Sequence, residues 1–436
     1  MAVRYNEALG ILKQVAIETL EREDGGKVEE IALQDAGSRI AATSVLSPTA
    51  TPIFDSATTD GYALSSAATA NASRMRPVTF VVKGTIAAGD KPPEVSTAGS
   101  TGVPPCFEVS MGAQFPKPAL EGQFDACVER MDVIPTVLGS EKMITITSPI
   151  QKNANRRIAG SDLQASEKIL EKGKTIQPQH IMALASAGFA TVAVRKKLRI
   201  AVWSTGNELV HRGSEKPPKV IDANGVFLSA ALRELGVDVD FMGILEDNAD
   251  AMSRALLDHA RDYTYDVVLT TGAISRGKID LIPSAFKALN TRFRFQEVAT
   301  RPGNHALFAT ADFGHGDVPF LALPGSPVEA AACFTFLVTP FIKELTGMRQ
   351  DVAKIVKIQS QSYQDLSMRC PPHFDCFMHG KFRGYDQGDV ILSDNQDTEK
   401  ISSFAASDCW VHIPRGHSGN YRDTLAYCYP HPSHGH

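Results

Sequence analysis

The sequence predicts a multidomain protein of the α/β and β classes, in which a doubly wound α/β domain lies between two β-rich regions. Three observations support this fold class. Strand-like and helix-like segments alternate from residue 198 to residue 347, as in a doubly wound domain. Short β-rich runs separated by glycine and proline occupy residues 78–150, and a second such region follows residue 347. A chain of 436 residues is also too long to fold around a single hydrophobic core, so about three domains are expected.

Composition restricts the compartment and the ligands. The formal net charge of -5 gives no general attraction to nucleic acid or anionic membranes, so local groups must hold any phosphorylated ligand. Prolines and Glu329 interrupt the apolar stretch 320–342, which excludes a membrane span. The N-terminal residues lack a signal-peptide core, and seven scattered cysteines suit a reducing compartment. We therefore expect a cytoplasmic protein.

The first 150 residues predict a helix followed by a β domain. Residues 4–22 have the apolar spacing of an amphipathic helix. Asp60 then precedes Gly61 in a polar loop. Asp60 fits a catalytic or magnesium-binding carboxylate, although an aspartate before glycine more commonly caps its own turn. The runs 78–83, 126–129 and 143–146 predict a small β-barrel or sandwich.

Two arginines precede an aspartate in the next segment. Arg156 and Arg157 lie six and five residues before Asp162. A guanidinium pair suits phosphate or carboxylate recognition, because its donors form a fork. A simple bridge from either arginine to Asp162 across a turn fits the spacing equally well.

The central region alternates regularly. We expect a helix at 179–187 before it, strands at 198–203, 237–245, 266–271 and 320–323, helices at 226–235 and 249–262, and a hairpin around residues 301–304. Ligands collect beyond the carboxyl ends of parallel strands. The polar residues at these ends should therefore converge, at least in part, on one cleft: Glu208, Asp222, Asp247, Ser275, Asp280 and Ser326.

The loop after residue 271 is the leading ligand site. Gly272, Ser275 and Gly277 follow a buried strand, and Asp280 opens a predicted helix. Glycines let backbone amides approach a phosphate, and a helix N-terminus favours an anion. A tight turn without a ligand fits this stretch equally well.

A second helix start predicts a capping box. Ser326 would be the N-cap, Pro327 the first helical residue and Glu329 the N3 partner. The structural reading is favoured here, and a carboxylate at that place would oppose an anionic ligand.

The C-terminal region predicts a small β domain with strands at 353–360, 374–382, 389–393 and 409–413. It contains four side chains of types that bind metals: Cys370, His373, Cys376 and His379. Strand alternation would place the histidines on one side and the cysteines on the other, which disfavours a zinc site. There is also no Walker loop, no dinucleotide-binding glycine motif after a strand and no nucleophile elbow, so ordinary NTPase, dinucleotide and hydrolase functions lack support.

Seven motifs in this order resemble the molybdenum insertases (molybdopterin molybdenumtransferases), the family that includes the gephyrin E domain. They lie at 55–63 (Asp-Ser-Ala-Thr-Thr-Asp-Gly-Tyr-Ala), 84–90 (Gly-Thr-Ile-Ala-Ala-Gly-Asp), 156–162 (Arg-Arg-Ile-Ala-Gly-Ser-Asp), 204–209 (Ser-Thr-Gly-Asn-Glu-Leu), 270–280 (Thr-Thr-Gly-Ala-Ile-Ser-Arg-Gly-Lys-Ile-Asp), 301–303 (Arg-Pro-Gly) and 323–327 (Leu-Pro-Gly-Ser-Pro). The resemblance implies an elongated homodimer. It also implies a discontinuous helical linker domain (1–52 and 150–196), an inserted β domain (53–149), an α/β domain (197–348) and a C-terminal β-barrel (349–436).

The resemblance further implies a reaction and its residues. Adenylylated molybdopterin would be cleaved with a divalent cation, usually Mg²⁺, and molybdate inserted to give molybdenum cofactor and AMP. The matching catalytic carboxylates are Asp60, Asp162, Glu208, Asp247 and Asp280, of which Glu208 and Asp280 would hold the metal. The matching cofactor-binding residues are Gly272, Ser275, Arg276, Gly277, Lys278, Arg301, Pro324 and Ser326.

Departures from the family pattern concern the oxyanion. The family's second glycine reads Ala273, a lysine reads Asn304 and a serine reads Glu329. A C-terminal arginine that helps to hold molybdate aligns with His379, and a threonine of the β domain with Met111. These changes remove positive charge and add a carboxylate, so they weaken the case for molybdate unless Arg276, Lys278 and Arg301 compensate. Two alternatives therefore stay open: recruitment to other small-molecule chemistry in the same cleft, and a non-catalytic scaffold.

Overall fold

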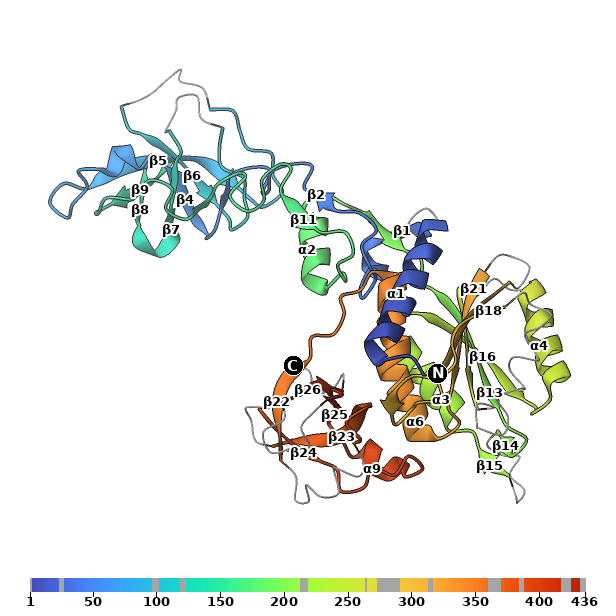
Figure 1. The fold of residues 1–436 in the computed structure, drawn as a ribbon. Helices are drawn as coiled ribbons and strands as arrows, with labels where there is room; N and C mark the ends of the chain where they lie inside the picture. The colour runs from blue at the N-terminus through green and yellow to red at the C-terminus, as the bar shows by residue number, and fades with distance from the viewer. Residues whose placement is uncertain are drawn as a thin grey trace.

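The structure, a computed structural model, describes residues 2–22, 27–95, 102–117, 123–211, 219–262, 265–272, 291–312, 317–359, 370–383, 388–416 and 425–431. Figure 1 shows an elongated molecule. A β sheet at one end is joined through a narrow segment to a larger body, which consists of an α/β unit and a β-barrel. The predicted multidomain fold class is confirmed, whereas the domain boundaries given above stay predictions.

The α/β unit is built on a six-stranded sheet in the order β16-β13-β17-β21-β20-β18. The first four strands are parallel, and the ladders to β20 and β18 are antiparallel. The chain starts at β13, adds β16 on one side and returns to β17 on the other, which creates a switch point between β13 and β17. The bounds are Arg199–Thr205 (β13), Asp238–Leu245 (β16), Val267–Thr271 (β17), Arg292–Phe295 (β18), Leu307–Asp312 (β20) and Asp317–Leu323 (β21).

Both faces of this sheet are buried, as its unbroken apolar runs predict. Ile200 and Val202 pack with helices α1, α3 and α7, whereas Ala201 and Trp203 pack against α4. This alternation follows from the two-residue repeat of a strand. Figure 1 shows the helical layers on opposite sides of the sheet. The helices span Tyr5–Arg22 (α1), Asn224–Glu234 (α3), Ala249–Asp262 (α4) and Thr339–Thr346 (α7).

The C-terminal strands close into a five-stranded barrel, because β25 pairs with both β23 and β26. The bounds are Lys354–Gln359 (β22), Asp375–Arg383 (β23), Asp389–Leu392 (β24), Cys409–Ile413 (β25) and Leu425–Pro430 (β26), with helix α9 at Ile401–Ala405. The hairpin expected around residues 301–304 is confirmed, because β18 and β20 pair antiparallel on either side of this loop, with Phe293 opposite Ala309, and the Val298 amide donates to the Asn304 carbonyl. Within the loop of this hairpin, strand β19 (Thr300–Arg301) also pairs in parallel with β23 of the barrel.

The N-terminal β unit is a six-stranded sheet in the order β7-β4-β6-β5-β9-β8. Its described strands belong to one sheet with a hydrophobic core on each face, in place of a closed barrel or a two-sheet sandwich. Loops of the same unit help to cover both faces. The bounds are Gly61–Leu64 (β4), Val78–Ile86 (β5), Pro105–Val109 (β6), Ala126–Glu129 (β7), Ile134–Leu138 (β8) and Glu141–Ile146 (β9), with short 3-10 helices at Ala67–Thr69 (η2) and Arg130–Asp132 (η3).

Short strand pairs connect this sheet with the larger body. Strand β1 (Val28–Ala32) pairs with β12 (Thr191–Arg195), β2 (Val45–Leu46) with β11 (Lys168–Leu170), and β3 (Ser56–Ala57) with β10 (Arg156–Arg157). Helix α2 (Pro178–Ser186) and the 3-10 helix η1 (Leu33–Asp35) pack into the core that the first two of these pairs share. The chain therefore passes through the connection twice. None of the helices described has an apolar stretch of the length that a bilayer requires.

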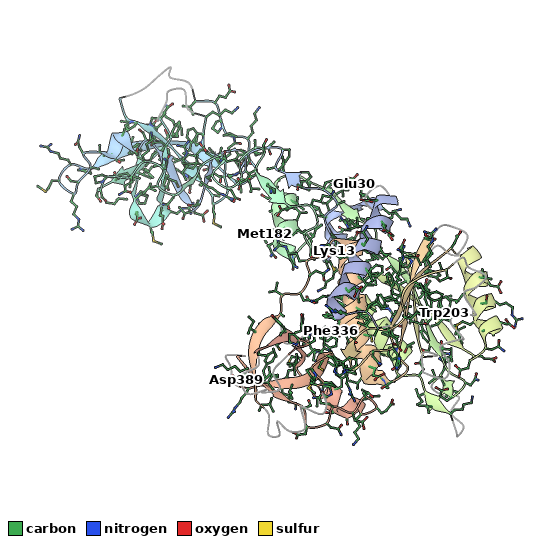
Figure 2. The ribbon with its side chains drawn as sticks, in the orientation of Figure 1. Lys13, Glu30, Met182, Trp203, Phe336 and Asp389 are labelled. Atoms are coloured by element: carbon green, nitrogen blue, oxygen red, sulfur yellow. The ribbon has the colours of Figure 1, made fainter. Side chains whose placement is uncertain are left out.

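An aromatic junction fixes the barrel against the α/β unit. Helices α6 (Pro327–Cys333) and α7 are joined by a π-helical segment, η5 (Phe334–Val338). Phe336 of this segment stacks on Phe377 of β23, with ring centroids 3.8 Å apart and planes 10° from parallel. Tyr5 and Trp410 contact the Phe336 ring edge-on. Figure 2 shows Phe336 where the helix meets the barrel.

Gly272 follows β17 where the end of β13 comes very close. Its φ of +90° lies in the left-handed region that favours glycine. A Cβ atom at this position would lie 2.1 Å from the carbonyl oxygen of Thr205, the last residue of β13. Backbone conformation and space both require glycine here.

Replacing Gly272 with alanine should lower the free energy of unfolding by about 2 kcal/mol or more, because the new Cβ must displace backbone as well as adopt a strained φ. Gly188 is the matched control: its φ is +91°, but nothing lies within 4 Å of a Cβ there. Gly188→Ala should cost about 1 kcal/mol. Equal losses in urea unfolding would contradict the steric argument.

Replacing Phe336 with alanine should lower the free energy of unfolding by about 3–5 kcal/mol, because a buried ring shared by three elements is removed. The measurement is urea unfolding followed by tryptophan fluorescence. Phe293→Ala, which removes an exposed ring on β18, should change stability by about 0.5 kcal/mol or less. A Phe336 variant as stable as the Phe293 variant would show that the junction does not hold the barrel.

Candidate functional site

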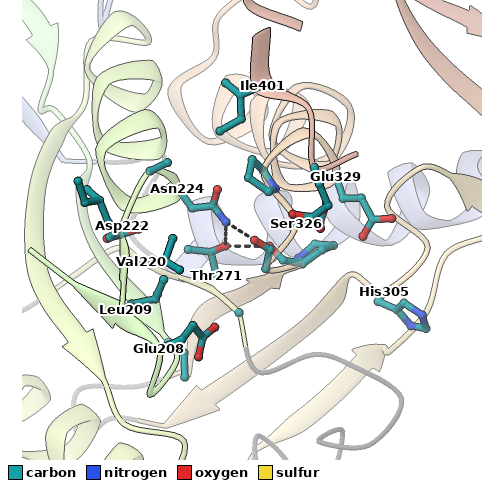
Figure 3. A pocket seen from close by; sticks show the side chains of 18 of the residues that line it. Glu208, Leu209, Val220, Asp222, Asn224, Thr271, His305, Ser326, Glu329 and Ile401 are labelled. Atoms are coloured by element: carbon teal, nitrogen blue, oxygen red, sulfur yellow. Dashed lines mark hydrogen bonds between the residues drawn. The ribbon is translucent and has the colours of Figure 1, made fainter. Parts of the chain in front are cut away.

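The described residues line an open cavity of about 670 Å³ at the carboxyl ends of the parallel strands. We call it the sheet-end cavity. Thr205, Asp247, Gly272 and Pro324, from the ends of four neighbouring strands, contribute to its wall. Figure 3 shows Asn224 and Ser326 beside it, at the starts of α3 and α6. The loops thus meet where the switch-point rule expects a ligand.

Two candidate carboxylates lie in this cavity on adjacent loops. Glu208, which follows β13, is exposed to the cavity, and Asp247 follows β16. The amide of Asp247 donates to Asn207 Oδ1 at 3.1 Å, and the amide of Asn207 lies 3.5 Å from Asp247 Oδ2. Asp247 therefore holds the loop that carries Glu208.

The structure brings together every expected polar loop residue that it describes. Glu208, Asp222, Asp247 and Ser326 all line the sheet-end cavity, together with Gly272 and Pro324. Five further candidates lie outside the described residues: Ser275, Arg276, Gly277, Lys278 and Asp280.

Asp222 has a structural task within this wall. It is buried, and it accepts a hydrogen bond from Ser204 Oγ at 2.6 Å and another from the Gly225 amide at 2.9 Å. Its two oxygens thereby tie the end of β13 to the first turn of α3. The same wall contains a polar network that sequence reasoning missed: Asn224 Nδ2 donates to Thr271 Oγ1 at 3.0 Å and to the Gly325 carbonyl at 2.7 Å. Figure 3 shows these bonds joining α3, β17 and the loop after β21.

The sequence contained a signal for Asn224 but none for two other residues of this cavity. Asn224 lies two residues after Asp222, so the strand order could have placed it in the same wall. His305 and Glu399 also line the sheet-end cavity. Glu399 comes from the barrel, and no local pattern connects it with a distant sheet.

The predicted capping box is wrong, although Ser326 is the N-cap residue of α6 and Pro327 is its first residue. Ser326 Oγ donates to the Thr398 carbonyl at 2.9 Å and makes no cap hydrogen bond. The Glu329 carboxylate instead faces the Gly303 amide. Partners from distant loops replace the local pair, which leaves Glu329 facing the cavity.

The arginine and aspartate motifs of the N-terminal unit lie away from this cavity. Arg157 and Asp162 form an exposed bridge at 3.2 Å, as the structural alternative expected. Arg156 pairs with Asp55 instead. Burial would raise the pKa of Asp55, but the Ala159 amide and Arg156 lower it below its ordinary value.

Asp60 is exposed and caps a neighbouring loop. It accepts a hydrogen bond from the Met111 amide at 2.8 Å, so its partner lies across the sheet and not in its own turn. Neither Asp60 nor Asp162 lines the sheet-end cavity of its own chain. The sheet that carries Asp60 is at the far end of the molecule from the α/β unit (Figure 1).

A second cavity of about 660 Å³ lies between α6 and the barrel. We call it the barrel cavity. Arg301, predicted to bind cofactor, lines this cavity and not the first one. Glu329 lines both. The two cavities are therefore neighbours that share one carboxylate.

His379 lies in the wall of the barrel cavity and is fully buried. Its Nδ1 contacts Ser393 Oγ at 3.0 Å. Burial, with a contribution from His431, lowers the pKa of His379 to about 4, so the ring is neutral at pH 7. Cys370 and Cys376 are buried, whereas His373 is exposed. Among the residues described, no three Cys, His, Asp or Glu side chains are grouped as metal ligands.

The sheet-end cavity nevertheless suits a cation shared between protein and ligand. Mg²⁺ is commonly held by one or two carboxylates, while phosphate oxygens and water complete its shell. The Glu208 and Asp247 carboxylates supply hard oxygen atoms, and an open cavity leaves room for a phosphorylated partner. The described donor set therefore fits a substrate-bridged ion better than a fully protein-bound one.

Comparison with known proteins relates this architecture to one family. A model described as the MoeA N-terminal region (domain I and II) matches residues 3–188, and a probable molybdopterin binding domain matches residues 201–344. The chain is 30% identical to a Synechococcus elongatus protein named molybdopterin molybdenumtransferase, over 89% of this chain and 91% of the relative. A Haemophilus influenzae protein of the same name is 27% identical, over 88% and 89% of the two chains.

Solved structures agree with the sequence relatives. The crystal structure of a molybdopterin biosynthesis MoeA protein from Pyrococcus horikosii superimposes with a TM-score of 0.75 and 26% identity, over 98% of this chain and 99% of that chain. The protein therefore belongs to the molybdopterin molybdenumtransferase family, a family of transferases in molybdenum cofactor biosynthesis.

Proposed function

We propose that this protein binds adenylylated molybdopterin in the sheet-end cavity, cleaves its phosphoanhydride with Mg²⁺ and inserts molybdenum from molybdate. The observation that carries the proposal is the meeting of Glu208, Asp247 and Gly272 in one cavity at the switch point. Loops at this place of an α/β sheet present backbone amides and acidic side chains to the same ligand.

The residues of the cavity would divide the work. Glu208 and, from the family resemblance, Asp280 would hold Mg²⁺, which would neutralise negative charge on the phosphoanhydride. Asp247 keeps the Glu208 loop in place through Asn207. Gly272, Pro324 and Ser326 would face the phosphates, with Ser275, Arg276, Gly277 and Lys278 as the further expected contacts.

Molybdate would occupy the barrel cavity. Arg301 offers a guanidinium there, and the shared Glu329 wall brings this cavity next to the proposed pterin site. The proposed compartment is the cytosol, and neither nucleic acid nor a membrane is proposed as a partner.

Glu208→Gln should reduce kcat/KM for cleavage of adenylylated molybdopterin by about 100-fold or more, because several kcal/mol of transition-state stabilisation by the cation would be lost. Raising the MgCl₂ concentration should restore part of the activity. Glu246→Gln is the matched control, since this exposed residue lies on the same side of the sheet but outside the cavity wall. An unchanged Glu208 variant, or an inactive wild type, would reject the proposed chemistry.

Asp60 and Asp162 require a different explanation, because they lie far from the cavity of their own chain. We propose a homodimer in which the N-terminal unit of one chain brings these carboxylates to the cavity of the other. A two-fold arrangement would build two equivalent sites, each from both subunits.

Subunit mixing tests this arrangement. Asp60→Asn and Glu208→Gln should each be nearly inactive alone, but randomly exchanged dimers should regain about a quarter of wild-type activity. The reason is that half of the dimers are hybrids, and each hybrid has one intact site. Sedimentation should give twice the mass of one chain. A monomer, or mixtures that stay inactive after exchange, would contradict the shared site.

A further inference from the structure

Glu329 occupies the boundary between the two cavities. It lies in the first turn of α6, is half-buried and lines both the sheet-end and the barrel cavity. The Gly303 amide faces its carboxylate and acts to lower the pKa of Glu329. Any ligand that fills the barrel cavity must therefore approach this carboxylate.

The charge of the barrel cavity makes that approach unfavourable for an anion. Its described lining includes one permanent cation, Arg301, and two carboxylates, Glu329 and Asp397. His379 adds no charge at pH 7, because its pKa is lowered to about 4. With both carboxylates ionised, this lining has one net negative charge. A dianion would meet repulsion that water inside a partly closed cavity screens incompletely.

Protonation of Glu329 would remove this repulsion. Burial, together with the nearby Glu399 carboxylate, raises the pKa of Glu329 above its ordinary value, although the Gly303 amide and Arg301 act in the opposite direction. A bound dianion would raise it further, because a second negative charge favours the neutral carboxyl. The neutral group could also donate a hydrogen bond to an oxyanion.

We propose that Glu329 determines the specificity of the barrel cavity: an oxyanion enters it together with one proton, which is taken from water and held by the Glu329 carboxylate. This inference rests on the proposed function, since molybdate is the oxyanion concerned. The carboxylate gains an O–H bond to a proton that the solvent gives up, no bond within the oxyanion changes, and one proton is bound for each anion bound.

Other ionisable groups around Glu329 have defined parts in this equilibrium. Glu399 repels the ionised carboxylate from the sheet-end side, and Arg301 attracts it from the barrel side. On its own helix, burial and the Glu329 charge raise the pKa of Cys333, which stays a neutral thiol. The remaining groups that line one of the two cavities are His305, His379, Asp397, Glu208, Asp222 and Asp247.

The test is calorimetric titration of the full chain with sodium molybdate between about pH 6 and pH 9. Above the pKa of Glu329 the protonated fraction falls tenfold per pH unit, so the apparent Kd should rise about tenfold per unit. Titrations in two buffers with different ionisation heats should give an uptake of about one proton per molybdate.

Glu329→Gln supplies the decisive variant, because its amide oxygen can still face the Gly303 amide. Its Kd should be nearly independent of pH and at least about tenfold lower than that of the wild type at pH 8. Asp394→Asn is the matched control, since it removes an exposed carboxylate near the barrel cavity but outside its lining. This control should keep the pH dependence of the wild type.

Several outcomes would overturn the inference: a pH-independent Kd for the wild type, no proton uptake, equal Kd values for wild type and Glu329→Gln, or no binding to either protein. The cleavage assay separates these outcomes from the proposed function. Cleavage of adenylylated molybdopterin with pH-independent molybdate binding would remove only the role of Glu329. Proton-coupled molybdate binding without cleavage would instead remove the proposed chemistry.

Discussion

The stacking of Phe336 on Phe377 is the contact on which the arrangement of both cavities depends. The α/β unit and the barrel have separate strand ladders, but the core of the α/β unit extends to Phe377 and Trp410 of the barrel. Their relative position is fixed where the π-helical turn presents Phe336 to the barrel strands. Glu399 reaches the sheet-end cavity from the barrel side of this contact. A change that weakens the junction should therefore also change the shape of the site.

Close backbone contacts at the strand ends fix the shape of the sheet-end cavity on the α/β side. Gly272 lets the ends of β17 and β13 approach, and Asn224 binds the neighbouring loops through Thr271 and Gly325. Asp222 anchors α3 in the same layer. These contacts use the polar groups that strand ends leave unpaired. These hydrogen bonds fix one polar wall of the sheet-end cavity, while the Glu208 side chain stays exposed to the cavity.

The start of α6 shows how tertiary partners override a local motif. Ser326 and Glu329 have the spacing of a capping box. Ser326 instead donates to the Thr398 carbonyl, and the Glu329 carboxylate faces the Gly303 amide. Capping bonds are worth about 1 kcal/mol, so a better-placed partner in the folded chain can replace them. The exchange turns Glu329 from a helix-stabilising residue into part of a cavity wall, next to an anion site in the proposed function.

The sequence by itself determined the order of elements, because buried parallel strands and amphipathic helices have periods that can be read locally. It also placed Glu208, Asp247 and Ser326 at strand ends, and strand ends of one sheet meet. Tertiary structure alone decided that β19 pairs with the barrel, that Glu399 joins the sheet-end cavity and that Asp60 lies far from it. The physical reason is that these contacts join segments distant in the chain, and their geometry depends on how whole units pack.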